Sequence, residues 1–112
     1  MMTGGNGPVD EAKVTPWLGV IQPDEGTLRS LLGGEGLDAT RWSNGPGDRY
    51  AAHRHSFHKV IYCVEGSITF TLPELDNRSF LMTPGDRLDL PTGVLHAALV
   101  GEQGVVCLEA HQ

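Results

Sequence analysis

Glycine and proline interrupt this chain so often that long regular elements have little room to form. The 112 residues include 15 glycines and 7 prolines. Both residue types favour turns, because glycine adopts positive φ angles and proline fixes φ and removes a backbone donor. Such frequent interruption favours many short strands joined by tight turns, which is typical of an antiparallel sandwich or a small barrel.

The clearest strand patterns come in two pairs. Lys59–Val64 is rich in β-branched and aromatic residues, and Ser67–Leu72 alternates between apolar and polar residues. With Glu65-Gly66 between them, these two segments predict a hairpin. Leu95–Val100 and Val105–Glu109 are separated by a stretch that contains two glycines, so they predict a second pair of strands joined by a turn.

The chain is long enough for one domain and too short for two. Residues 1–15 are rich in glycine and lack periodicity, so they predict a flexible tail, or a strand that orders only against a partner. A single domain is then expected over residues 16–112. Thr27–Leu32 fits either a strand or a short helix. Because no convincing ten-residue helix separates the strands, a parallel α/β sheet is not expected.

Charge and cysteine content narrow the possible partners and the compartment. The formal net charge is −6 and no run of Lys or Arg occurs, which argues against binding to nucleic acid or to a membrane surface. The N-terminus lacks the pattern of a signal peptide, and no apolar run is long enough to span a bilayer. Cys63 and Cys107 lack CxxC spacing, so we expect buried thiols and a cytoplasmic protein.

Three histidines are placed as potential metal ligands. His53 and His55 are two residues apart, and on a strand such side chains point to the same face. His96 follows a Pro-x-Gly turn, at or just inside the start of a strand. If the two strands lie side by side or face each other, the three imidazoles can bind one metal ion. Imidazole suits several divalent metals, so the ligand type alone does not choose among them.

The spacing of these histidines and of the glycines around them resembles the two sequence motifs of the cupin family. The first cupin motif is matched in spacing by Gly47, His53, His55, Lys59 and Gly66. The second is matched by Gly85, Pro91, Gly93, His96 and Val100. Both motifs occur in the right order and together span residues 47–100.

The resemblance implies an all-β jelly-roll barrel (a double-stranded β-helix) of the RmlC-like type, often dimeric, with a metal inside. It implies His53, His55 and His96 as ligands of a divalent ion such as Zn, Fe, Mn or Ni. Two positions depart from the family pattern, because Lys59 replaces the ligand glutamate and Val100 replaces the final asparagine. An ammonium has no lone pair and repels a divalent cation, so Lys59 is not carried over as a ligand.

Lys59 is the candidate catalytic residue, with several roles left open. It can point outward into solvent, swing out to pair with an acid, or donate to an anionic ligand at the metal. As a neutral amine it can also bind metal or act as a base. Glu109 can supply the missing carboxylate from another strand, or it is an exposed acid near the C-terminus.

Several other polar and aromatic residues carry weaker hypotheses. His58 neighbours Lys59 and is expected at the surface or an interface, unless a bulge reverses its orientation. Cys63 is expected to be buried on the same side as Lys59. Arg41 either reaches a ligand carboxylate or lies at the surface, and His111 is expected to be frayed at the chain end.

Function remains open between three classes. The first is a small metal-dependent enzyme, a dioxygenase or an isomerase, that acts on a small polar molecule. The second is a non-catalytic cupin that binds a small ligand, as a sensor or accessory protein without metal. The third is an inert barrel that acts through its dimer surface. A homodimer is expected because so short a chain buries only a modest core, and Trp17–Ile21 is a candidate for exchange between subunits.

Overall fold

The computed structural model describes residues 12–112. Within this range the chain forms one helix and a set of antiparallel strands, which confirms the all-β jelly-roll expectation. The elements are β1 (Lys13–Thr15), α1 (Glu25–Gly34), β2 (Thr40–Asn44), β3 (Arg49–His53), β4 (Lys59–Leu72), β5 (Arg78–Met82), β6 (Arg87–Leu90) and β7 (His96–His111).

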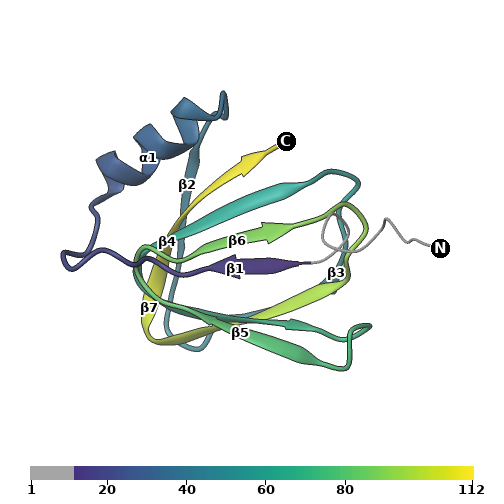
Figure 1. Cartoon of the computed structure of the whole chain (residues 1–112). Coiled ribbons are helices and arrows are strands. Elements are labelled where there is room, and N and C mark those ends of the chain that lie inside the picture. The colour runs from purple at the N-terminus through teal and green to yellow at the C-terminus, as the bar shows by residue number, and fades with distance from the viewer. Residues whose placement is uncertain (1–11) are drawn as a thin grey trace.

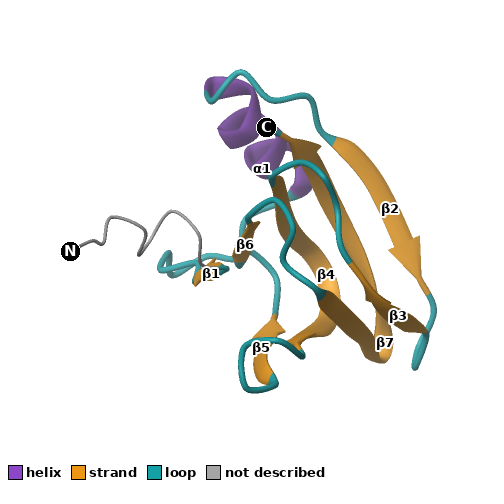
Figure 2. Ribbon diagram, turned by 90° about the vertical axis from the view of Figure 1, so that its right-hand side faces the viewer, coloured by secondary structure: helices purple, strands orange, loops and turns teal. Residues whose placement is uncertain are grey.

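Strands β4 and β7 pair along most of their length and contribute to both layers of the barrel (Figures 1 and 2). One layer has the order β1, β6, β4, β7, β2 and uses the first half of β4 with the last half of β7. In the other layer, β5 pairs with the second half of β4, and β3 pairs with the first half of β7. The two long strands therefore join the layers.

The bend in these strands lies at Gly66 and Gly104. Both have positive φ angles, of 74° and 76°, and the register of β4 against β7 shifts on either side of Gly66. The two backbones approach so closely that a Cβ on Gly66 would lie 2.0 Å from the carbonyl oxygen of Gly104. The predicted hairpin at Glu65-Gly66 and the predicted turn over residues 101–104 are thus wrong. Both glycines bend continuous strands as β-bulges do, rather than reversing the chain.

The helix α1 confirms the helical alternative for Thr27–Leu32, but at ten residues it is longer than the sequence pattern predicted. Asp24 caps its first turn, because the carboxylate accepts a hydrogen bond from the amide of Thr27 at 2.8 Å. Leu28 and Leu32, four residues apart, are fully buried on one face. The high glycine content of the sequence argued against a helix of this length. Glycine disfavours helical structure but does not forbid it, and the last turn of α1 contains two glycines.

The alternation of side chains in β4 divides the interior into two cores. Val60, Tyr62 and Val64 point outward and pack under Leu28 and Leu32 of α1, which lies near the C-terminal end of β7 (Figure 2). The residues between them, such as Ile61 and Cys63, point inward to the core between the two layers. The inner face of β4 therefore lines the barrel, while its outer face carries the helix.

The N-terminal segment contributes the edge strand of the first layer. Residues 13–15 form β1 and pair with β6, whereas residues 1–11 of the expected tail lie outside the described residues. Trp17 then holds a loop in place, with its amide donating to Asp86 at 3.1 Å and its indole to the carbonyl of Ile21 at 2.9 Å. Nearby, Leu18 is largely exposed. The one helix within residues 12–112 is too short and too polar to cross a membrane.

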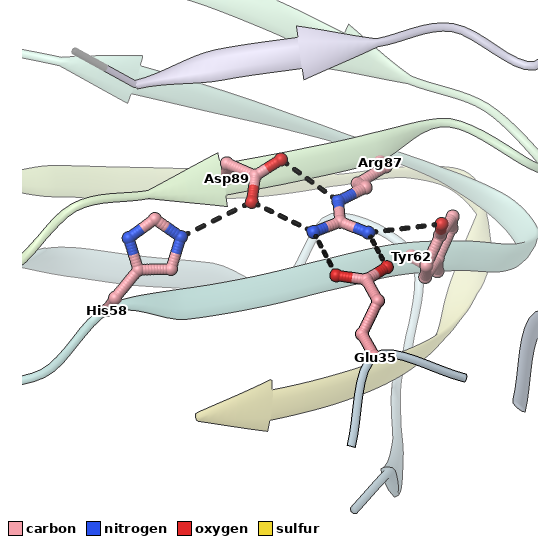
Figure 3. Close-up of polar contacts among 5 residues, drawn as sticks. All are labelled: Glu35, His58, Tyr62, Arg87 and Asp89. Carbon is pink, nitrogen blue, oxygen red and sulfur yellow. Dashed lines mark hydrogen bonds and ion pairs between the residues drawn. The ribbon is translucent and has the colours of Figure 1, made fainter. Parts of the chain in front are cut away.

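A polar cluster joins the end of α1 to β4 and β6 on the outside of the barrel (Figure 3). Arg87 donates to both oxygens of Glu35, just after the helix, and its Nε donates to Asp89 at 2.9 Å. His58 lies 3.3 Å from the other oxygen of Asp89, and the hydroxyl of Tyr62 accepts from Arg87 at 3.5 Å. Burial alone would raise the pKa of Asp89, but hydrogen bonds from Arg87 and His58 outweigh it and hold the pKa below its usual range.

Replacing Gly66 with alanine is expected to destabilise the fold by at least about 2 kcal/mol, because the new Cβ meets the backbone of Gly104 at positive φ. Urea unfolding of the two proteins measures this difference. The matched control is Gly33→Ala, where no atom lies within 4 Å of the added Cβ. That helix substitution is expected to raise the free energy of unfolding by up to about 1 kcal/mol. Equal stability of Gly66→Ala and the wild type would contradict the proposed bend.

Replacing Asp89 with asparagine is expected to cost about 1–3 kcal/mol of unfolding free energy at neutral pH, because Arg87 loses a charged partner. Since the folded-state pKa is lowered, the stabilisation is present above the unfolded value of 3.8 and is lost as the pH falls through the folded value. Urea titrations at neutral pH and near pH 3 measure both effects. Asp38→Asn, at an exposed position, is the control. A cost that is the same at both pH values would contradict this account.

Candidate functional site

The three predicted histidines come together at one end of the barrel. His53 ends β3 and pairs directly with His96 at the start of β7, and His55 follows in the loop. The ring centroids lie 4.4 Å apart for His53 and His96, and 4.8 Å apart for His53 and His55. One nitrogen from each ring forms a set whose members lie within 4.8 Å of one another. Strand pairing therefore accounts for His53 and His96, whereas His55 reaches the cluster from the loop after β3 and not, as the spacing predicted, from the same strand.

Hydrogen bonds to backbone carbonyls set the tautomers of two of these rings. Nδ1 of His53 lies 2.8 Å from the carbonyl oxygen of Ala51, and Nδ1 of His96 lies 2.9 Å from that of Val94. A carbonyl oxygen can only accept a hydrogen bond, so each Nδ1 carries the hydrogen and each Nε2 keeps its lone pair. Nε2 of His55 is buried and has no hydrogen-bond partner. This donor set fits a metal ion, because an orphaned imidazole nitrogen is costly unless it is coordinated.

The protonation state of the rings agrees with that fit. Burial, together with the positive charges that His53, His55 and Lys59 can carry, lowers the pKa of His96 to about 4, although the hydrogen bond with the carbonyl of Val94 opposes this shift. Burial, followed by Lys59 and His53, also lowers the pKa of His55. Both rings are therefore neutral at physiological pH, and neutral imidazole is the form that binds metal.

A cavity of about 180 Å³ opens beside the histidines. It is small compared with typical ligand pockets of roughly 300–1,000 Å³. Its walls come from strands of both layers, and most of them are apolar or aromatic: Trp42, Tyr50, His53, Lys59, Ile61, Phe70, His96, Ala98 and Glu109. The barrel interior thus holds space for a molecule of a few atoms next to the imidazoles.

Lys59 and Glu109 form an ion pair inside this cavity. Lys59 is only 9% exposed, and its Nζ lies 3.4 Å from Oε1 of Glu109. The indole of Trp42 donates to that same oxygen at 2.9 Å, and the ring of His111 lies 3.2 Å from Oε2. An outward-pointing Lys59 and an exposed Glu109 are both wrong expectations, because the register of β4 and β7 makes the two residues diagonal neighbours on the inner face.

The remaining candidates lie away from the cavity centre. His58 points to the outer face and pairs with Asp89, and Arg41 pairs with Glu25 at 3.1 Å. Cys63 opposes Cys107 in the strand pair, and both are fully buried. A hydrogen bond with Cys63, together with burial, raises the pKa of the Cys107 thiol, so this thiol stays protonated.

Phe57 is a part of the site that sequence reasoning missed. Its ring stacks on His55 with centroids 4.9 Å apart and on His111 with centroids 4.0 Å apart. His111 is therefore packed against another ring instead of frayed. The stacking restrains the orientation of the His55 ring. Because Phe57 lies in an irregular segment, neither strand nor helix periodicity could have placed it.

These features define a small cupin domain, an antiparallel barrel of two layers with three histidines at its internal cavity. The chain belongs to the family of AraC-like ligand-binding domains, whose model matches residues 37–105. A search of curated proteins found no match.

Solved structures support the same fold. An RmlC-like cupin from Shewanella frigidimarina is 25% identical, with a TM-score of 0.58, over 67% of this chain and 64% of that chain. The polyketide cyclase RemF from Streptomyces resistomycificus is 26% identical, with a TM-score of 0.58, over 67% of this chain and 54% of that one. The DMSP lyase DddQ from Ruegeria pomeroyi is 21% identical, with a TM-score of 0.61, over 68% of this chain and 38% of that one. This chain thus spans less than two thirds of the length of each of these three proteins.

The burial of Lys59 can be tested by chemical modification. Lys13, in the edge strand, is exposed, so it should be acetylated by limiting reagent in the native protein roughly tenfold faster or more than Lys59, which reacts only after local opening. Peptide mass spectrometry measures both rates, and the difference should vanish after denaturation. Equal rates in the native state would place Lys59 on the surface instead.

Proposed function

We propose that this chain is a cupin that holds one divalent metal ion on His53, His55 and His96 and binds a small polar molecule beside it. The observation that carries the proposal is the buried Nε2 of His55, which lacks a hydrogen-bond partner and belongs to a cluster of three imidazoles. Three neutral nitrogen ligands are sufficient for a catalytic type of site and leave positions open for water or substrate. Zn, Fe, Mn and Ni all remain compatible with this ligand set.

The protein groups around the cluster are suited to hold a polar ligand in a fixed orientation. When bound, the metal would act as a Lewis acid toward an oxygen of that ligand. Lys59 directs its ammonium into the same cavity, where it can donate a hydrogen bond or a proton at Nζ. Trp42 and Phe70 supply apolar walls that limit the access of water. We therefore retain Lys59 as the candidate catalytic residue of a small metal-dependent enzyme, an isomerase or a dioxygenase.

A second candidate is a non-catalytic module that binds a small ligand without metal, as a sensor or accessory protein. The membership in a family of ligand-binding domains favours it. The two candidates differ in one property that is simple to measure. Ligand binding by a metal-free module would be unchanged by a chelator, whereas the metal-dependent site would lose it.

Metal analysis of protein purified without a histidine tag tests the first proposal. We expect about one ion per chain after exposure to Fe, Mn, Ni or Zn and dialysis, since a preformed three-histidine site retains its metal. His96→Ala should weaken binding at least roughly 100-fold, because it removes a ligand rather than a supporting contact. His58→Ala, a histidine outside the cluster, should leave binding unchanged. Less than about a tenth of an ion per wild-type chain would overturn the proposal.

A further inference from the structure

We propose that Lys59 makes this cavity a binding site for the carboxylate of a small organic acid. The inference rests on the proposed function, since it names the ligand class of the same cavity. Its basis is a buried ammonium with unused hydrogen-bonding capacity, placed next to apolar walls.

The contact between Lys59 and Glu109 leaves the ammonium incompletely satisfied. An ammonium has three N–H donors. Glu109 is the one carboxylate within 4.0 Å of Nζ among residues 12–112, and its 3.4 Å distance exceeds the roughly 2.7–2.9 Å of a charge-assisted hydrogen bond. Glu109 is also shared with Trp42 and His111. A second carboxylate can therefore bind Lys59 without displacing the first.

The charge of the cavity favours an anion over a neutral or cationic molecule. Lys59 and Glu109 offset each other, and imidazole binds a metal ion in its neutral form, so the ligands add no charge of their own. A divalent ion on the three histidines would then leave an excess of positive charge in a largely buried space. A carboxylate between this ion and Lys59 balances part of that excess, and burial makes the balance stronger than it would be in water.

The size and the walls of the cavity indicate an organic acid rather than an inorganic oxyanion. Its volume of about 180 Å³ is below the roughly 300–1,000 Å³ of typical ligand pockets, which favours a small molecule. Trp42, Ile61, Phe70 and Ala98 line it with apolar surface that a short hydrocarbon chain can contact. Phosphate or sulfate would leave this surface without a partner.

Lysine-selective 13C labelling followed by NMR tests the inference directly, because the sequence contains two lysines, Lys13 and Lys59. Each signal is assigned with the variants Lys13→Gln and Lys59→Gln. Titration of the metal-loaded wild type with sodium propanoate should shift the Lys59 signal and leave the Lys13 signal in place. Propanamide, the neutral analogue, and inorganic phosphate should both bind much more weakly than propanoate.

The variants supply changes of opposite sign. Lys59→Gln should weaken propanoate binding roughly tenfold to a hundredfold, the loss expected of one charge-assisted hydrogen bond, and Lys13→Gln should not. Glu109→Gln should strengthen binding a few-fold, because it removes a negative charge that repels the incoming carboxylate. Circular dichroism checks that each variant is folded. The NMR titration of the wild type tests the inference even if a variant fails to fold.

The outcomes separate this inference from the proposed function. Metal retained by Lys59→Gln together with weakened propanoate binding supports both proposals. Equal propanoate binding by the wild type and Lys59→Gln, or an unshifted Lys59 signal, overturns the carboxylate assignment while metal content still supports the three-histidine site. Preference for phosphate over propanoate overturns the assignment of the ligand as an organic acid.

Failure of the wild type to take up metal overturns the proposed metal site. If that same protein also shows no propanoate binding that depends on Lys59, the carboxylate inference is overturned as well.

Discussion

The pairing of β4 with β7 is the constraint on which the rest of this structure depends. These two long strands stay paired on both sides of their common bend, so each takes part in both layers of the barrel. The bend requires positive φ angles at Gly66 and Gly104, whose backbones are too close to admit a side chain. The remaining strands attach to one half or the other of this central pair, and α1 covers its outer face.

The same register places the chemistry. On the inner face of the first layer it brings Lys59 diagonally across from Glu109, and in the second layer the start of β7 places His96 opposite His53. Tyr62 on the outer face of β4 and His58 just before this strand belong to a separate polar cluster with Arg87 (Figure 3). Alternation along a strand thus separates a polar cavity from a structural ion-pair network although the residues involved are adjacent in sequence.

The sequence predicted the barrel and the histidine cluster because both rest on local spacing. A Pro-x-Gly turn precedes His96, and His55 follows His53 closely enough to reach the same cluster, although it does so from the loop after β3 and not from the strand. The orientation of the Lys59 side chain was harder to predict. An irregular segment separates Lys59 from His55, so the alternation along a single strand could not be extended from one residue to the other. The roles of Glu109 and Phe57 depend on cross-strand register and loop packing, which no single segment encodes. The roles of Gly66 and Gly104 were also ambiguous, since a glycine with positive φ can form either a turn between two strands or a bend within one strand.

The replacement of a carboxylate by Lys59 changes the electrostatics of the cavity more than its shape. A glutamate at this position would add a negative charge beside the three imidazoles, whereas Lys59 adds a positive one, a difference of two charges. Glu109 compensates for one of them from the neighbouring strand, at 3.4 Å and without joining the histidine cluster. The compensation is therefore incomplete as soon as a cation binds to the imidazoles. In a buried cavity an uncompensated charge is costly. A ligand that carries a negative charge would supply the missing charge at the lowest cost, so the carboxylate site proposed above follows from the presence of Lys59 at the position where the cupin motif has a glutamate.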